Sequence, residues 1–186
     1  MRRALGLVVA SALMLVPAVA QAQRMAQGQR MGMGPGEGHE LGVDFAIAWS
    51  KPSGGNGALE LLTPVDVRLG LPSHGKLSLE PRFSMRLESD GGTAYTIDPG
   101  VNVLYKLSGS AYNRNTYLTG GADLDLLKAG TSGAVFGLNG GLGMRHPWGA
   151  GAFRTEIFAR YAFENTKLGV PNTFSLGVRL GISLWH

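Results

Sequence analysis

Apolar and polar residues alternate with a period of two from Glu40 to the C-terminus. Successive side chains of a β-strand point to opposite faces, so this period predicts strands with one apolar and one polar face. Short stretches rich in Gly, Ser, Pro and Asn separate the strands and predict turns, among them 146–149. No stretch has the period of an amphipathic helix. We expect eight strands, at about 41–49, 61–71, 77–87, 95–107, 117–126, 136–145, 153–164 and 174–184.

Eight sequential strands with short connections predict an all-β fold, an eight-stranded antiparallel up-and-down barrel. The alternating segments of roughly 9 to 13 residues match the ~9 to 11 residues that cross a bilayer as a tilted strand. This length favours a transmembrane β-barrel with its apolar face outside. The alternative is a secreted soluble, lipocalin-like carrier with the opposite orientation.

The composition of the polar face supports the transmembrane orientation. It carries as many acids as bases, most of the bases are Arg, and glycines are interspersed with them. Charges inside a narrow barrel must pair, and Arg pairs well with carboxylates. We therefore predict a structural charge network in the lumen, formed by Asp66, Arg68, Glu80, Arg82, Arg86, Asp98, Asp123, Asp125, Arg145, Arg154, Glu156, Arg160 and Arg179.

The N-terminus has the pattern of a secretory signal peptide. Arg2 and Arg3 precede the apolar run 4–16, and Ala20-Gln21-Ala22 is a small-x-small cleavage site. The run is short of the ~20 residues of a spanning helix, so we expect residues 1–22 to be removed. Residues 23–39 are rich in Gly, Met and Gln and are predicted to be a disordered lead-in, which leaves 40–186 as the barrel.

Composition excludes several classes of function. The chain has no cysteine, so disulfides and thiolate metal sites are excluded. Two of its 17 basic residues lie in the signal peptide and the rest nearly balance 13 acidic ones, which argues against nucleic acid as a partner.

With its last strand, Phe174-Ser-Leu-Gly-Val-Arg-Leu-Gly-Ile-Ser-Leu-Trp-His186, the chain resembles the OmpA-type eight-stranded outer-membrane barrel family, represented by the barrel domain alone. The resemblance implies a monomer in the cell outer membrane of a Gram-negative bacterium, in contact with membrane lipid and lipopolysaccharide. It also implies that the last strand is an assembly signal for the barrel-insertion machinery, carried by Gly181, Leu184, Trp185 and His186. A second register, with Ser175, Gly177, Leu180 and Ile182, fits the same pattern.

No constellation in the sequence points to an enzyme. His39, His74, His146 and His186 lie before the first strand, in predicted turns or at the C-terminus, and none accompanies a Ser and an acid as a hydrolytic triad requires. The pair Asp123 and Asp125 is better explained by lumenal ion pairs than by calcium or acid–base chemistry. We expect no catalytic residue, no metal and no cofactor.

Aromatic residues near the strand ends suggest the two interfacial girdles of a transmembrane barrel. If both termini are periplasmic, the connections at 50–59, 88–93, 127–133 and 165–173 face outside, and all are short. The favoured hypothesis is a structural, envelope-integrity barrel with a closed lumen. Alternatives are a porin-like narrow pore or small-ligand barrel, a lipid-modifying outer-membrane enzyme, and the soluble carrier. The girdle residues are Trp49, Tyr95, Tyr105, Trp148, Phe153, Phe163, Phe174 and Trp185.

Overall fold

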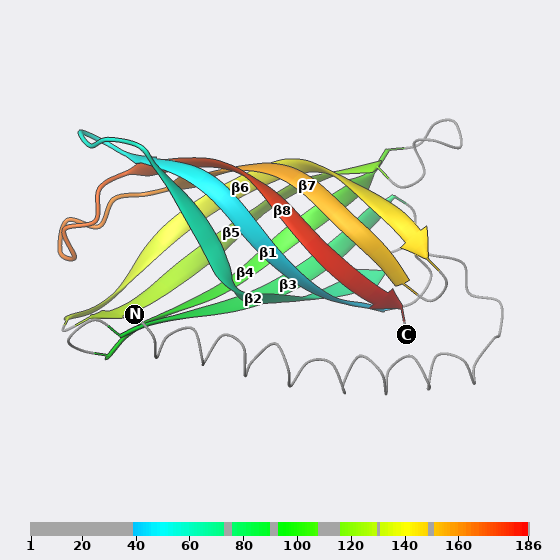
Figure 1. Ribbon diagram of the computed structural model, residues 1–186, viewed down its shortest axis with the longest axis horizontal. Coiled ribbons are helices and arrows are strands. Elements are labelled where there is room, and N and C mark those ends of the chain that lie inside the picture. Colours follow the sequence, from blue (N-terminus) through cyan, green and yellow to red (C-terminus); the bar gives the residue numbers. More distant parts are fainter. Residues whose placement is uncertain are drawn as a thin grey trace.

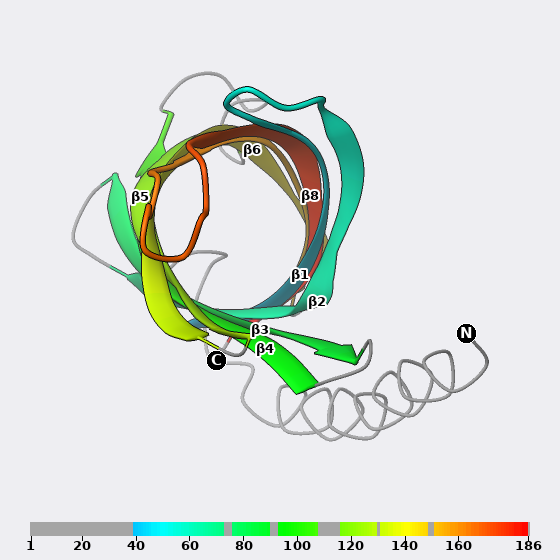
Figure 2. The ribbon, with the colours of Figure 1, turned by 90° about the vertical axis from the view of Figure 1, so that its left-hand side faces the viewer.

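The fold is a closed barrel of eight strands, each antiparallel to its neighbours in sequence, with β8 returning to pair with β1 (Figures 1 and 2). The computed structural model describes residues 39–72, 76–89, 93–107, 116–129, 131–148 and 151–185. The predicted fold class is confirmed, whereas the signal peptide and most of the 23–39 lead-in lie outside the described residues. The strands are β1 (Glu40–Pro52), β2 (Ala58–Pro72), β3 (Leu77–Ser89), β4 (Thr93–Lys106), β5 (Thr116–Ala129), β6 (Thr131–Trp148), β7 (Gly151–Ala162) and β8 (Thr173–Trp185).

Strand boundaries differ from the sequence-based expectation by up to five residues, as at Thr131, where β6 begins. The predicted turn at 146–149 is wrong, because His146, Pro147 and Trp148 continue β6 and pair with the first residues of β7. Strand pairing thus continues up to a connection of two residues, the shortest common hairpin loop, and it overrides the turn propensity of Pro147. The seventh strand ends at Ala162, two residues earlier than predicted.

The apolar faces of the strands point outward and the polar faces point into the barrel. On β1, Leu41, Phe45 and Trp49 are exposed, while Asp44 and Ala48 between them are buried. Large exposed apolar side chains occur on all eight strands, so the outer surface is an apolar belt. A soluble carrier would have these side chains inside, and that alternative is therefore wrong. No helix in the described part of the chain is long and apolar enough to span a membrane.

The two ends of the barrel differ in their connections. We call the end that holds Glu40 and Trp185 the terminal end, and the opposite end, with the 53–57 and 163–172 connections, the loop end (Figure 1). The 163–172 connection projects over one side of the barrel mouth at the loop end (Figure 2). Its Asn165 side chain donates to the carbonyl of Ala134, 2.8 Å away, which ties it to the rim.

Exposed aromatic side chains lie near both ends, where girdles are expected. Near the loop end, Phe163 stacks on Phe136 and meets the ring of Tyr161 edge-on, with ring centres 5.6 and 5.1 Å apart. Near the terminal end, Trp148 and Phe153 are exposed on β6 and β7. The side chain of Trp185 lies outside the described set.

Seven of the eight seams pair along most of their length, and the β2–β3 seam does not. Pairs between β2 and β3 run from Pro72↔Ser78 to Val67↔Phe83 and stop there. On its other side β2 pairs with β1, and the register of that pairing shifts between Asp44 and Ala46 of β1. Their partners on β2 are Asp66 and Leu62. Three residues of β2, 63–65, therefore oppose the single residue Phe45 of β1, which is a β-bulge that bends the strand.

Candidate functional site: the charged lumen

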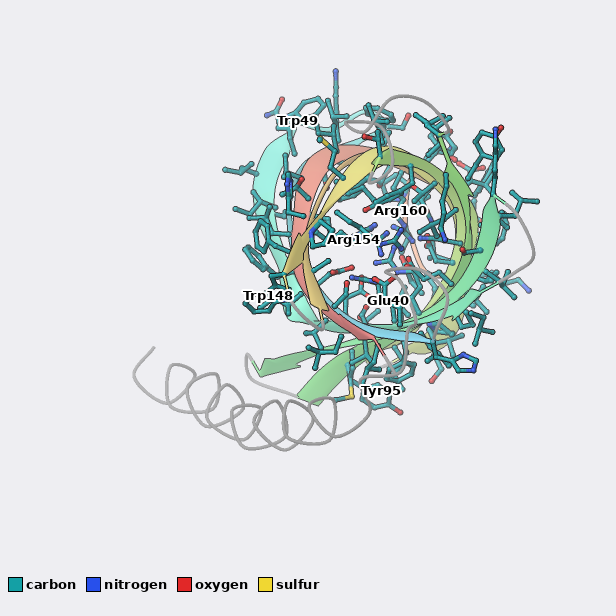
Figure 3. All side chains as sticks on the ribbon, turned by 90° about the vertical axis from the view of Figure 1, so that its right-hand side faces the viewer. Glu40, Trp49, Tyr95, Trp148, Arg154 and Arg160 are labelled. Carbon is teal, nitrogen blue, oxygen red and sulfur yellow. The ribbon has the colours of Figure 1, made fainter. Side chains whose placement is uncertain are left out.

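The inward rows of all eight strands converge on the barrel axis. Figure 3 shows Glu40, Arg154 and Arg160 pointing into the barrel, whereas Trp49 and Trp148 point away from it. Because successive side chains of a β-strand point to opposite faces, every second residue of each strand points into the lumen.

Arg68 of β2 is the first of two hubs. Its Nη1 donates to Glu40 Oε1 at 2.5 Å and lies 3.3 Å from Glu80 Oε2, its Nε donates to Asp44 Oδ2 at 2.8 Å, and its Nη2 donates to Ser183 Oγ at 2.6 Å. Its side chain is 1% exposed. A guanidinium that is buried to this extent needs several hydrogen-bond acceptors, and three carboxylates and one hydroxyl surround that of Arg68.

Arg154 of β7 is the second hub. Its Nη1 donates to Glu80 Oε2 at 2.6 Å, its Nη2 donates to Glu156 Oε2 at 2.8 Å, and its Nε donates to the Tyr117 hydroxyl. The guanidinium groups of Arg154 and Arg145 both lie 4.8 Å from the centre of the Tyr117 ring. Glu80 is shared between the two hubs, so they form one network.

Three more arginines extend this network. Arg145 donates to Glu40 at 2.8 Å, Arg179 donates to Glu156 at 2.5 Å and lies 4.0 Å from Asp66, and Arg82 pairs with Asp66. The ion pairs join five arginines and five carboxylates into one continuous, charge-balanced cluster. We call it the terminal cluster: Glu40, Asp44, Asp66, Arg68, Glu80, Arg82, Arg145, Arg154, Glu156 and Arg179.

A smaller group lies nearer the loop end. Arg160 donates to Asp123, with its Nε 2.8 Å from Oδ1, and to both oxygens of Asp125 at 2.7 Å. Asn139 donates to Asp123 at 3.0 Å. Asp98 accepts from Ser84 Oγ at 2.8 Å. We call Asp98, Asp123, Asp125 and Arg160 the loop-side group, in which one arginine accompanies three carboxylates.

Glycines on the inward rows make room for these side chains. A Cβ at Gly42 would overlap the guanidinium of Arg68, and one at Gly181 would overlap the carboxylate of Asp44. On the outer face, a Cβ at Gly120 would meet nothing within 4 Å. The inward glycines are therefore required by packing around the charges.

Small residues line the rest of the lumen toward the loop end. Ala46, Ala48 and Phe158 form a buried apolar cluster, and the hydroxyls of Ser50 and Ser175 hydrogen-bond at 2.9 Å. On this side the lumen wall thus has apolar and hydroxyl contacts in addition to the ion pairs of Arg160.

The structure places twelve of the thirteen predicted network residues in the lumen with charged or hydroxyl partners, and the side chain of Arg86 lies outside the described set. The predicted network omitted Glu40, Asp44, Tyr117 and Ser183, all of which contact its arginines. Glu40 shares the parity of Gly42 and Asp44, and this signal could have found it. Asn102 is fully buried on β4, and its side-chain amide has no hydrogen-bond partner among the described residues.

The remaining predicted sites can be placed but not assigned a chemistry. Gly181 faces the lumen on β8 and Leu184 is half-buried at its end, while His186 lies outside the described residues. His39 and His146 are exposed. The described residues contain no group of His, Asp and Glu side chains arranged to hold a metal ion.

No family model matches the chain, and no curated protein matches it. Among solved structures, Neisserial surface protein A matches with a TM-score of 0.57 at 14% identity, over 81% of this chain and 98% of that one. The chain has the fold of a small outer-membrane β-barrel.

Two further matches are more distant. Ail, the attachment invasion locus protein of Yersinia pestis, matches with a TM-score of 0.47 at 12% identity over 80% of this chain and 99% of that one. The N-terminal β-barrel domain of Pseudomonas aeruginosa OprF matches with a TM-score of 0.41 at 11% identity over 77% and 97%. At these identities the likeness concerns the fold alone.

Proposed function

We propose that this protein is a non-enzymatic structural barrel of the outer membrane, with a lumen closed by the terminal cluster, that contributes to envelope integrity. The observation that carries the proposal is the continuous network of five arginines and five carboxylates across the lumen. The outward apolar belt supports a place in lipid, in contact with phospholipid and lipopolysaccharide.

The terminal cluster favours closure over conduction for an electrostatic reason. Its described acidic and basic side chains bind one another, so the cluster presents no ring of one charge sign to a passing ion. The cluster draws on β1, β2, β3, β6, β7 and β8, and Tyr117 adds β5 through its bond with Arg154. Closure and mechanical cross-linking of the wall thus come from the same contacts.

Planar-bilayer recordings test the closed lumen. We expect no steady conductance from the wild type, and measurable conductance from the double variant Glu80→Ala/Arg154→Ala, which removes one charge of each sign from the centre of the cluster. The matched control is Glu164→Ala/Lys167→Ala in the exposed 163–172 connection, which we expect to remain closed. Steady conductance of the wild type would overturn the closed lumen and favour the narrow pore.

Two further assays test the role. A strain that lacks the protein is expected to become sensitive to detergent with a chelator, and the wild-type gene should restore resistance. The purified barrel is expected to leave phospholipid and lipid A unmodified, and turnover of either lipid would contradict a structural role. Removal of Leu184, Trp185 and His186 is expected to lower the amount of assembled barrel if β8 carries the assembly signal.

A further inference from the structure

The β2–β3 seam leaves two strand edges without a partner near the loop end. Residues 58–62 and 66 of β2 remain paired with β1, and residues 84–89 of β3 remain paired with β4. Within these described ranges no pair joins β2 to β3 beyond Val67↔Phe83. Figure 2 shows the ends of β3 and β4 leaning away from β2 on the lower right of the barrel.

These edges run beside the apolar belt. Two residues of the predicted loop-end girdle mark the depth of these edges: Trp49 pairs with Leu59 of β2, and Tyr95 pairs with Leu87 of β3. Most of both edges therefore lies between the girdle and the middle of the barrel. The neighbouring outward side chains of Val67, Phe83 and Met85 are exposed. A backbone N–H or C=O without a partner costs several kcal/mol in hydrocarbon, so edges at this depth require one.

The chain itself opposes closing the seam. The bulge at 63–65 bends β2, and bulged strands diverge from the plane of their neighbours. Pro64, inside the bulge, has no N–H to offer a ladder. The bulge thus bends β2 next to the point where its pairing with its own β3 stops, and a partner strand can follow the bent edge.

We propose that the partner is a second copy of this chain, which makes a two-fold symmetric dimer in the membrane. β2 and β3 run in opposite directions, so a two-fold axis parallel to the barrel axis sets β2 of each copy antiparallel to β3 of the other. Both edges of both copies are then paired and the assembly is closed, as an isologous interface requires. The proposal rests on the membrane placement proposed above and departs from the monomer expected from the sequence.

The absence of cysteine from the chain allows a direct cross-linking test. The paired part of the seam has one constant register, and its continuation sets position 65 opposite position 85. Directly opposed residues have Cα atoms within disulfide range. Two single variants, Val65→Cys and Met85→Cys, carry different tags and are reconstituted together in lipid vesicles before oxidation. We expect a mixed disulfide dimer that contains both tags.

Matched controls separate contacts between copies from contacts within one chain. Val67→Cys and Phe83→Cys lie opposite each other inside one chain, so their mixture should give no dimer, while the double variant should cross-link within the monomer. The proposal is overturned if the Val65→Cys and Met85→Cys mixture gives no dimer. It is equally overturned if the Val65→Cys/Met85→Cys double variant cross-links only within one chain, because the seam then closes on itself.

A second measurement uses the wild-type chain. With one fluorophore on an N-terminal tag, single-molecule photobleaching in vesicles should show two steps for most particles. Single steps throughout would contradict the dimer even if the cysteine variants fold poorly. Each variant is first checked by its heat-dependent gel mobility, so a failure to insert, which would count against the proposed function, is distinguished from insertion as a monomer.

Discussion

At the terminal end of the lumen five arginines face five carboxylates, whereas toward the loop end one arginine accompanies three carboxylates among the described side chains. The Arg154 side chain is 1% exposed and that of Arg160 is 22% exposed. The two regions therefore differ in the solvation of their charges as well as in the ratio of arginines to carboxylates. A buried charge must be neutralised by its neighbours, while a partly hydrated one can rely on water. The comparison supports the proposal that the terminal cluster closes the lumen, while the loop-side group lines its wall.

The largest expected effect is at the centre of the terminal cluster. Arg154→Ala leaves Glu80 and Glu156 short of a buried partner, and breaking a buried ion pair in this way costs about 3–5 kcal/mol. Urea unfolding in lipid vesicles, followed by tryptophan fluorescence, measures the loss. A loss below that of Arg160→Ala would contradict the difference between the two regions.

A smaller loss is expected in the loop-side group. Arg160→Ala removes hydrogen bonds to Asp123 and Asp125. A hydrogen bond to a charged group contributes about 1.5–3 kcal/mol to stability when water cannot replace it. Here water can replace part of them, so the total loss should lie within that range. The same unfolding assay compares the two arginine variants in one lipid, and equal losses would remove the distinction.

Glycine substitutions sharpen the same contrast between crowded and open positions. Gly181→Ala would force the Asp44 carboxylate away from Arg68, and overpacking of this kind costs about 1–3 kcal/mol. Gly120→Ala on the open outer face should be neutral or stabilise by up to about 1 kcal/mol, because it restricts the unfolded chain. The temperature at which the folded gel band disappears measures both variants, and equal shifts would show that lumenal crowding is unimportant.

The smallest effect is expected at the loop end. Asn165→Ala removes the bond to the carbonyl of Ala134 and the acceptor of the Lys167 N–H, which is worth about 0.5–1.5 kcal/mol. Hydrogen exchange should increase in the 163–172 connection while the terminal cluster keeps its protection. An equal increase in both regions would mean that the mouth and the terminal cluster unfold together.

The fold and the inward face could be predicted because both follow from parity. A strict period of two set Arg154, Glu156 and Arg160 on the face opposite Phe153 and Ile157, and the structure has them there. The turn at 146–149 failed because local propensity competes with the continuing β6–β7 ladder, which only the paired strand reveals.

The partners of the charges could not be predicted. Glu40 and Arg145 are 105 residues apart and meet only because the barrel closes. Tyr117 begins the fifth predicted strand, and its alternation does not reveal that its hydroxyl accepts from Arg154, 37 residues away. The bulge opposite Phe45 and the end of the β2–β3 pairing could not be predicted either, because two-residue alternation alone does not show a register shift.

The most direct test of the central claim, a closed β-barrel with its apolar face in the outer membrane, is the gel mobility of the protein from outer-membrane fractions with and without boiling. A folded transmembrane barrel resists SDS until it is heated, so we predict a compact band before boiling that shifts to the mobility of the unfolded chain afterwards. Recovery of the protein only in the soluble periplasmic fraction, with one mobility before and after boiling, would contradict the account.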